Sequence, residues 1–172
     1  SLAPSGVVPP RPLVPGVHSF HVLPLDPSLP LRIQQRDVYS LNDLLNLLMA
    51  NDTAVNESIT QLLFGGSLLA WMDTLSQVRN RQTLLEKVSL ISKKLRYKDT
   101  DLAVFALRCT LDPGQPLPLI RDISLAHPGQ IEAVLRKTPQ AKKALAQRVM
   151  QGYFEQWLRA AQFPGWEEDV SF

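Results

Sequence analysis

The sequence predicts a mainly α-helical fold built from two tandem units that pack together as one body. A segment that begins at Leu25, Leu-Asp-Pro-Ser-Leu-Pro-Leu, returns 86 residues later at Leu111 as Leu-Asp-Pro-Gly-Gln-Pro-Leu. In both halves, apolar residues recur with the spacing i, i+3, i+4, i+7, which places them on one face of a helix. Since neither unit can readily bury such a face alone, we expect the two units to share a core.

The offset of 86 residues also matches Gly66 with Gly152 and Trp71 with Trp157. Apolar residues follow the same register without a gap: Leu45 matches Ile131, Leu48 matches Val134, Ile59 matches Leu145, Leu63 matches Val149 and Met72 matches Leu158. A constant register over this length indicates an internal duplication.

Composition limits the class of protein. The chain has 172 residues, of which 45% are hydrophobic and 20% charged, so it is neither disordered as a whole nor a coiled coil. No apolar run reaches the roughly 18 residues that a membrane span requires. The single cysteine, Cys109, excludes an internal disulfide and a zinc site made of several cysteines. A net charge of +2 is too small to indicate a partner by itself.

The predicted organisation has three parts. Residues 1–16 contain five prolines, which favour an extended linker or a frayed tail. Residues 17–98 form the first helical unit with a connecting helix, and residues 99–172 form the second unit. From the proline-rich start we expect the C-terminal part of a larger cytoplasmic protein.

Each unit is expected to open with a turn at its Leu-Asp-Pro segment, where Asp26 or Asp112 caps the backbone. A short extended piece follows, with Leu31 and Ile33 on one face. Ser40 then has the position of a helix N-cap before an apolar stripe. In the second unit the corresponding helix starts at Pro128, because proline suits a first helical turn.

Two further helices are predicted in each unit. One runs over residues 53–64 and its counterpart over residues 139–151, each ending at a glycine. The next begins at Ser67 and carries Trp71, and its counterpart carries Trp157; both tryptophans are expected in the core.

Two segments lie between these matched helices. Residues 80–96 are expected to form an amphipathic helix. The following apolar run, residues 102–107, is too short for periodicity to distinguish a strand from a buried helix. Near the C-terminus, Trp166 is consistent either with a core position or with an exposed docking tail.

Reactive groups are few. Cys109 lies among leucines and is expected to be buried and inert. His18 and His21 point to opposite faces of an expected strand, and His127 is expected at the surface or as a helix cap. We therefore predict no metal site, no cofactor and no catalytic set, and an enzyme or effector that uses Cys109 or the aspartates is the least favoured hypothesis.

Basic residues are concentrated in the second half of the sequence. The predicted binding surface consists of Arg79, Arg81, Lys87, Lys93, Lys94, Arg96 and Lys98. A second basic set consists of Arg136, Lys137, Lys142, Lys143 and Arg148. The alternative for both sets is a solvated helix face. No aromatic RNA-binding signature or recognition helix accompanies them.

These observations predict a non-catalytic protein–protein interaction module of an adaptor or regulatory kind, whose partner is another protein or a peptide. The alternative function is a nucleic-acid-binding accessory domain that uses the basic helices.

Overall fold

The structure is a computed structural model, and it describes residues 29–76, 78–95 and 99–166. It confirms that the fold is mainly helical. The expected linker over residues 1–16, the extended segment with His18 and His21, and the turn at Asp26 lie outside the described residues. Among the described residues, no helix combines the length and the apolar character needed to cross a membrane.

The first half consists of a two-stranded hairpin followed by three helices. Its elements are β1 (Leu31–Ile33), β2 (Arg36–Val38), α1 (Leu41–Ala50), α2 (Thr53–Gly65) and α3 (Ser67–Thr74). The extended piece predicted at Leu31 is therefore the first strand of an antiparallel pair, with Leu31 opposite Val38. Its turn places Gln34 and Gln35 at positive φ, 51° and 67°.

The predicted N-cap of α1 is confirmed. The hydroxyl of Ser40 accepts a hydrogen bond from the backbone N–H of Asp43, at 3.1 Å. Asp52 caps α2 in the same way, because its carboxylate accepts from the N–H of Val55 at 3.0 Å. Both caps satisfy a backbone donor that the first turn of a helix leaves unpaired.

Two helices, α4 (Arg81–Leu95) and α5 (Thr100–Leu111), connect the halves. The apolar run over residues 102–107 is thus helical, and every residue in it is buried. A helical segment in which every residue is buried must be covered by neighbours on several sides. In α5 these neighbours come from both halves of the molecule, since it packs against α1, α2 and α4 and also against α8.

The second half again has two strands followed by helices. Its elements are β3 (Leu117–Ile120), β4 (Ile123–Leu125), the short 3₁₀ helix η2 (Pro128–Gln130), α6 (Ile131–Lys137), α7 (Pro139–Gln151) and α8 (Tyr153–Ala161). Pro128 does begin a helical turn, which is 3₁₀ before it continues as α6. At the Leu-Asp-Pro turn, the carboxylate of Asp112 accepts from the N–H of Gly114, as predicted.

Gly66 and Gly152 each join two consecutive helices. They have φ values of 93° and 90°, a left-handed conformation that side chains other than glycine rarely adopt. At each junction the glycine N–H donates to a carbonyl of the helix that is ending, and the next helix starts at once. The turn directs α8 from the end of α7 back against α5.

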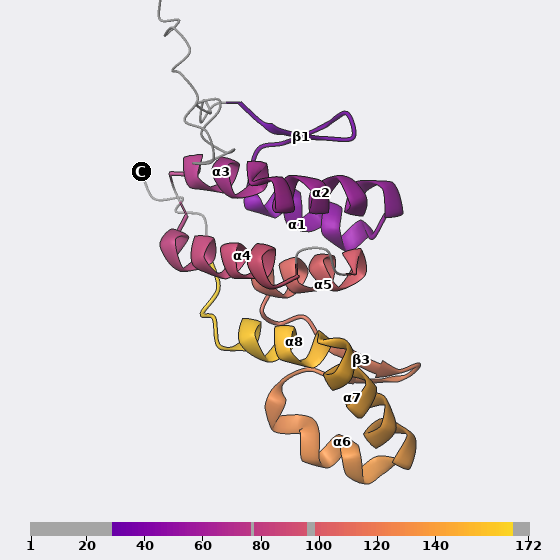
Figure 1. Ribbon diagram of the computed structural model, residues 1–172. Coiled ribbons are helices and arrows are strands. Elements are labelled where there is room, and N and C mark those ends of the chain that lie inside the picture. The colour runs from indigo at the N-terminus through magenta and orange to yellow at the C-terminus, as the bar shows by residue number, and fades with distance from the viewer. Residues whose placement is uncertain (1–28, 77, 96–98, 167–172) are drawn as a thin grey trace, which may run out of the picture.

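Figure 1 shows the helices stacked in layers along one long axis, with the β1–β2 hairpin at one end and α6 at the other. The buried side chains form two clusters. One cluster joins α1–α4 to one side of α5, and the other joins Phe105 and Cys109 of α5 to β3, α7 and α8. Trp71 and Trp157 are 3% and 1% exposed, which confirms their core positions. Trp166 packs against the first cluster, and its indole N–H donates to the carbonyl of Leu111 at 2.7 Å.

Candidate functional site

The basic residues around α4 have different environments. Arg81 is part-buried and donates from its guanidinium to the carbonyl of Leu75, 2.9 Å away, and to that of Asp73 at 3.3 Å. These carbonyls lie at the C-terminal end of α3, where helix carbonyls lack partners within the helix. The Arg81 side chain therefore has a structural role, since it pairs with backbone carbonyls at the end of α3.

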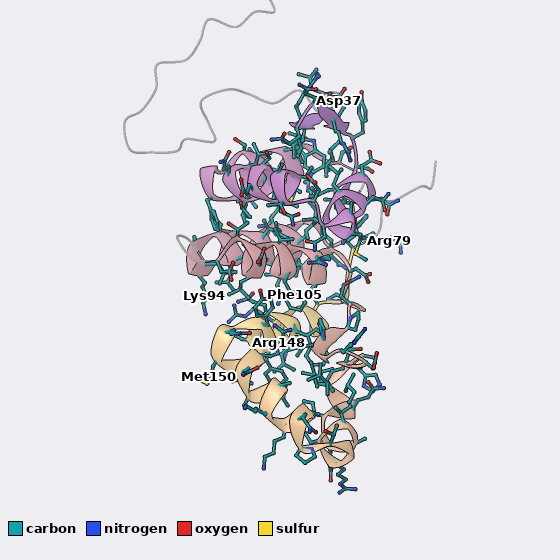
Figure 2. All side chains as sticks on the ribbon, turned by 90° about the vertical axis from the view of Figure 1, so that its right-hand side faces the viewer. Asp37, Arg79, Lys94, Phe105, Arg148 and Met150 are labelled. Carbon is teal, nitrogen blue, oxygen red and sulfur yellow. The ribbon has the colours of Figure 1, made fainter. Side chains whose placement is uncertain are left out.

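The other residues of the predicted surface are spread along the molecule. Lys93 and Lys94 are exposed in the last turn of α4, and Lys87 is partly buried on the same helix. Figure 2 shows Lys94 at the left and Arg79 at the right of the helical layer that contains α4. Arg96 and Lys98 lie outside the described residues. The structure does not bring the described members of this set into one cluster.

The second basic set is also divided. Arg136 forms an exposed ion pair with Glu132 one helical turn away. Lys142 and Lys143 are exposed near the start of α7, whereas Arg148 turns inward at its end. The side chain of Lys137 is outside what the structure describes.

The outer face of α7 combines these lysines with apolar side chains. Val149 and Met150 are 51% and 87% exposed, and Ala146 lies one turn before them. At the helical spacing i, i+4, i+8, Lys142, Ala146 and Met150 share one face. Figure 2 shows Met150 at the outer edge of the molecule. We call Lys142, Lys143, Ala146, Val149 and Met150 the α7 face.

A cavity of about 380 Å³ lies where the two halves meet. Its lining residues are Asn51, Asp101, Val104, Phe105, Arg108, Gln115, Pro116, Pro118, Arg148 and Tyr153. Four of them, at positions 101, 104, 105 and 108, form one stripe along α5. The others come from the end of α1, the chain entering β3, the end of α7 and the start of α8. We call this the α5 cavity; Figure 2 labels two of its lining residues, Phe105 and Arg148.

Aromatic rings and an arginine form one wall of the α5 cavity. The rings of Phe105 and Tyr153 are 5.1 Å apart between centroids, tilted by 58°. The guanidinium of Arg148 lies 5.1 Å from the centroid of the Tyr153 ring, a cation–π distance. Its Nε donates to the carbonyl of Pro118 at 2.9 Å, which fixes the arginine at the cavity edge.

The second arginine, Arg108, is less well satisfied. Its Nε is buried and has no hydrogen-bond partner among the residues that the structure describes. A buried donor without an acceptor is uncommon, because it loses its bond to water and gains nothing in return. Of the two arginines that line the α5 cavity, Arg108 is the one with a buried N–H group that has no hydrogen-bond acceptor among the described residues.

The pKa of Tyr153 depends on the charged groups around the α5 cavity. Burial raises the pKa of its phenol, and the carboxylates of Asp99 and Asp101 add to the increase. Arg148 and Arg108 act on the same pKa in the opposite direction. Burial and the two carboxylates outweigh the two arginines, so the pKa of Tyr153 is raised overall.

The remaining candidates for chemistry are separated from the α5 cavity. Cys109 is buried, as predicted, and burial raises the pKa of its thiol to about 12. The thiol is therefore protonated at neutral pH, which opposes a nucleophilic role. His127 is exposed and precedes η2 without a side-chain cap. No group of three His, Cys, Asp or Glu side chains suited to a metal ion occurs among the described residues.

Comparison of the chain with protein-family models, with curated proteins and with solved structures gave no match.

Sequence reasoning missed the α5 cavity. Its lining residues range from position 51 to position 153, so only the folded chain assembles them. One signal was present: Asp101 and Arg108 interrupt the apolar residues of α5 at a spacing of seven, which puts two charges on one helix face. This pattern could not be recognised from the sequence, because the apolar run over residues 102–107 is equally compatible with a strand, in which positions seven apart lie on opposite faces.

Proposed function

We propose that the protein is a non-catalytic module that binds another protein, and that this partner docks on the α7 face. The observation that carries the proposal is Met150, a large apolar side chain that is 87% exposed beside the half-exposed Val149. Methionine adapts its shape to a partner and is frequent at binding surfaces that accept apolar side chains.

The charges next to this apolar patch define the chemistry of the partner. Lys142 and Lys143 are both exposed on the same helix, two turns before Met150. A partner segment that offers apolar side chains to Met150 and carboxylates to the lysines would complement both features. The partner we propose is therefore an acidic protein segment with apolar anchors, and a cytoplasmic location remains part of this proposal.

A photo-crosslinking residue in place of Met150 tests for this partner in cells. The protein that it captures should be purified, and its affinity measured by calorimetry for the unmodified chain and for two double variants. Lys142→Glu with Lys143→Glu should weaken binding by at least about tenfold, because both reversed charges repel an acidic segment.

Lys93→Glu with Lys94→Glu is the matched control. It reverses the same two charges on an exposed turn of α4, away from the apolar patch. This variant should bind within about twofold of the unmodified chain. Equal losses in the two variants, or no crosslinked protein at position 150, would contradict docking on the α7 face.

Nucleic-acid binding is the second candidate, and the exposed lysine pairs on α4 and α7 favour it. Phosphate contacts are additive and sensitive to salt. Both double variants should then weaken binding of short RNA or DNA to a similar extent, and both should reduce its salt dependence.

We further infer that residues 31–74 and 117–160 derive from a duplicated unit. The support is the coincidence of element bounds: at the offset of 86, α2 corresponds to α7 residue for residue. Gly66 and Gly152 also share a left-handed conformation at the same junction. Superposing the two backbones in an experimental structure tests this inference, and different paths of the three helices would contradict it.

A further inference from the structure

The α5 cavity is separate from the α7 face and has the features of a small-molecule site. Its volume of about 380 Å³ lies in the range of known ligand sites, roughly 300–1,000 Å³. It combines an apolar wall, formed by Val104, Phe105 and Pro116, with a few polar groups that converge on it. This combination fixes the orientation of a ligand while burying its carbon skeleton.

We propose that the α5 cavity binds a small carboxylate, whose oxygens are held by the guanidinium groups of Arg108 and Arg148. Arg108 and Arg148 both line the cavity, so their guanidinium groups are the cationic hydrogen-bond donors of its wall. Arg148 is already fixed by the Pro118 carbonyl and the Tyr153 ring, so little side-chain entropy is lost when it binds an anion. A planar guanidinium matches the two oxygens of a carboxylate.

The charge of the lining favours a monoanion over a dianion. The two arginines contribute two positive charges, and Asp101 contributes one negative charge to the same wall. Asp99 is not a lining residue, but its carboxylate also raises the pKa of Tyr153 in this wall. The two carboxylates repel a phosphate dianion more strongly than they repel a single carboxylate. The aromatic and proline side chains then contact the apolar body of the acid.

The test is an NMR titration of the full chain with three phenyl compounds of similar size: benzoate, benzamide and phenyl phosphate. Benzoate should shift the amide resonances of residues lining the α5 cavity in a saturable way. Benzamide has the same shape without the charge, and it should bind at least about tenfold more weakly. Equal binding of benzoate and benzamide, or stronger binding of phenyl phosphate, would overturn the carboxylate assignment.

Arginine variants locate the binding groups. Arg108→Gln and Arg148→Gln should each weaken benzoate binding by about tenfold or more. Arg108→Lys keeps the charge but lacks the planar guanidinium, so its affinity should fall between that of the unmodified chain and that of the Arg108→Gln variant. Arg136→Gln removes an exposed arginine from α6 and should bind benzoate as the unmodified chain does. An NMR spectrum of each variant shows whether it keeps the fold, and Arg108→Lys preserves the test if a glutamine variant does not.

Two carboxylates distinguish the possible sources of the ligand. Benzoate represents a free organic acid, and the dipeptide N-acetyl-alanyl-phenylalanine represents the C-terminus of a chain. Tighter binding of benzoate identifies a free acid, and tighter binding of the dipeptide identifies a chain terminus; both support a carboxylate site. Failure of both to saturate overturns it. This result is independent of the proposed docking on α7, because the titration contains no protein partner.

Discussion

The indole N–H of Trp157 donates a hydrogen bond to the backbone carbonyl of Gln115, 2.9 Å away. Trp157 is 1% exposed, and this bond satisfies the only polar atom of its ring. The side-chain amide of Gln115 in turn donates to the carboxylate of Asp112, at 2.8 Å. Helix α8 is thus attached to the Leu-Asp-Pro turn that leads from α5 into β3, next to the α5 cavity.

Replacing Trp157 by phenylalanine removes this hydrogen bond and leaves the Gln115 carbonyl without its partner. We expect the free energy of unfolding to fall by about 1–3 kcal/mol from the unpaired group, with a further loss from the smaller ring. Urea unfolding followed by circular dichroism measures it. Tyr39→Phe is the control, because Tyr39 is 61% exposed and its change should be within about 0.5 kcal/mol. Equal midpoints for the two variants would contradict the role of Trp157.

Gly152→Ala should destabilise the protein by about 1–2 kcal/mol or more, because φ is +90° at this position. The added Cβ would also lie 3.2 Å from Cδ2 of Leu102. Gly65→Ala is the matched control at the end of α2, where a Cβ meets nothing within 4 Å. Alanine there should be neutral or stabilise the fold by up to about 1 kcal/mol. Thermal unfolding compares the two variants, and a stable Gly152→Ala protein would refute the strain at this junction.

The pKa of Cys109 predicts how stability depends on pH. Its ordinary value of 9.0 applies to the unfolded chain, and burial raises it to about 12 in the folded protein, with a smaller opposing effect of Arg108. The unfolded state therefore loses its proton first, so the contribution is fully present below about pH 9 and declines as pH rises toward 12. At pH 9.5 the loss should be about 0.8 kcal/mol. Urea unfolding at pH 7.5 and 9.5 measures it, and Cys109→Ala should show a smaller fall between these pH values. The same fall in both proteins would exclude Cys109 as its source.

Arg81→Ala should lower the free energy of unfolding by about 1–3 kcal/mol, because two carbonyls at the end of α3 lose a charged donor. Lys93→Ala removes a positive charge from the exposed end of the same helix and should change stability by no more than about 0.5 kcal/mol. Denaturant midpoints of the two variants test the difference. If both variants are as stable as the unmodified chain, Arg81 is a free surface residue and returns to the predicted binding set.

Helices with clear start and stop signals were predicted well from the sequence. Ser40 marks the start of α1, and the expected helix over residues 139–151 coincides with α7. The strand pairing was missed, because the turn between β1 and β2 uses Gln34 and Gln35 at positive φ. Asparagine–glycine pairs usually supply that conformation, so no turn signal was visible.

The binding residues were harder to predict than the helices. Sequence reasoning grouped Arg79, Arg81 and Lys94 by their closeness along the chain, but the fold gives them separate environments. Arg108 and Arg148 are 40 positions apart and line the same cavity. Such pairs depend on how α5, α7 and α8 pack, and charge patterning within one helix does not contain that information.

Helix α5 contributes to both hydrophobic clusters, with Leu107 in one and Phe105 in the other. If either half unfolds, it exposes one buried side of α5, while the opposite side of α5 is still part of the core of the other half. The free energy of unfolding is shared between the halves, which couples them into one cooperative transition. A ligand in the α5 cavity would accordingly protect both halves of the described fold against proteolysis, including residues far from where it binds.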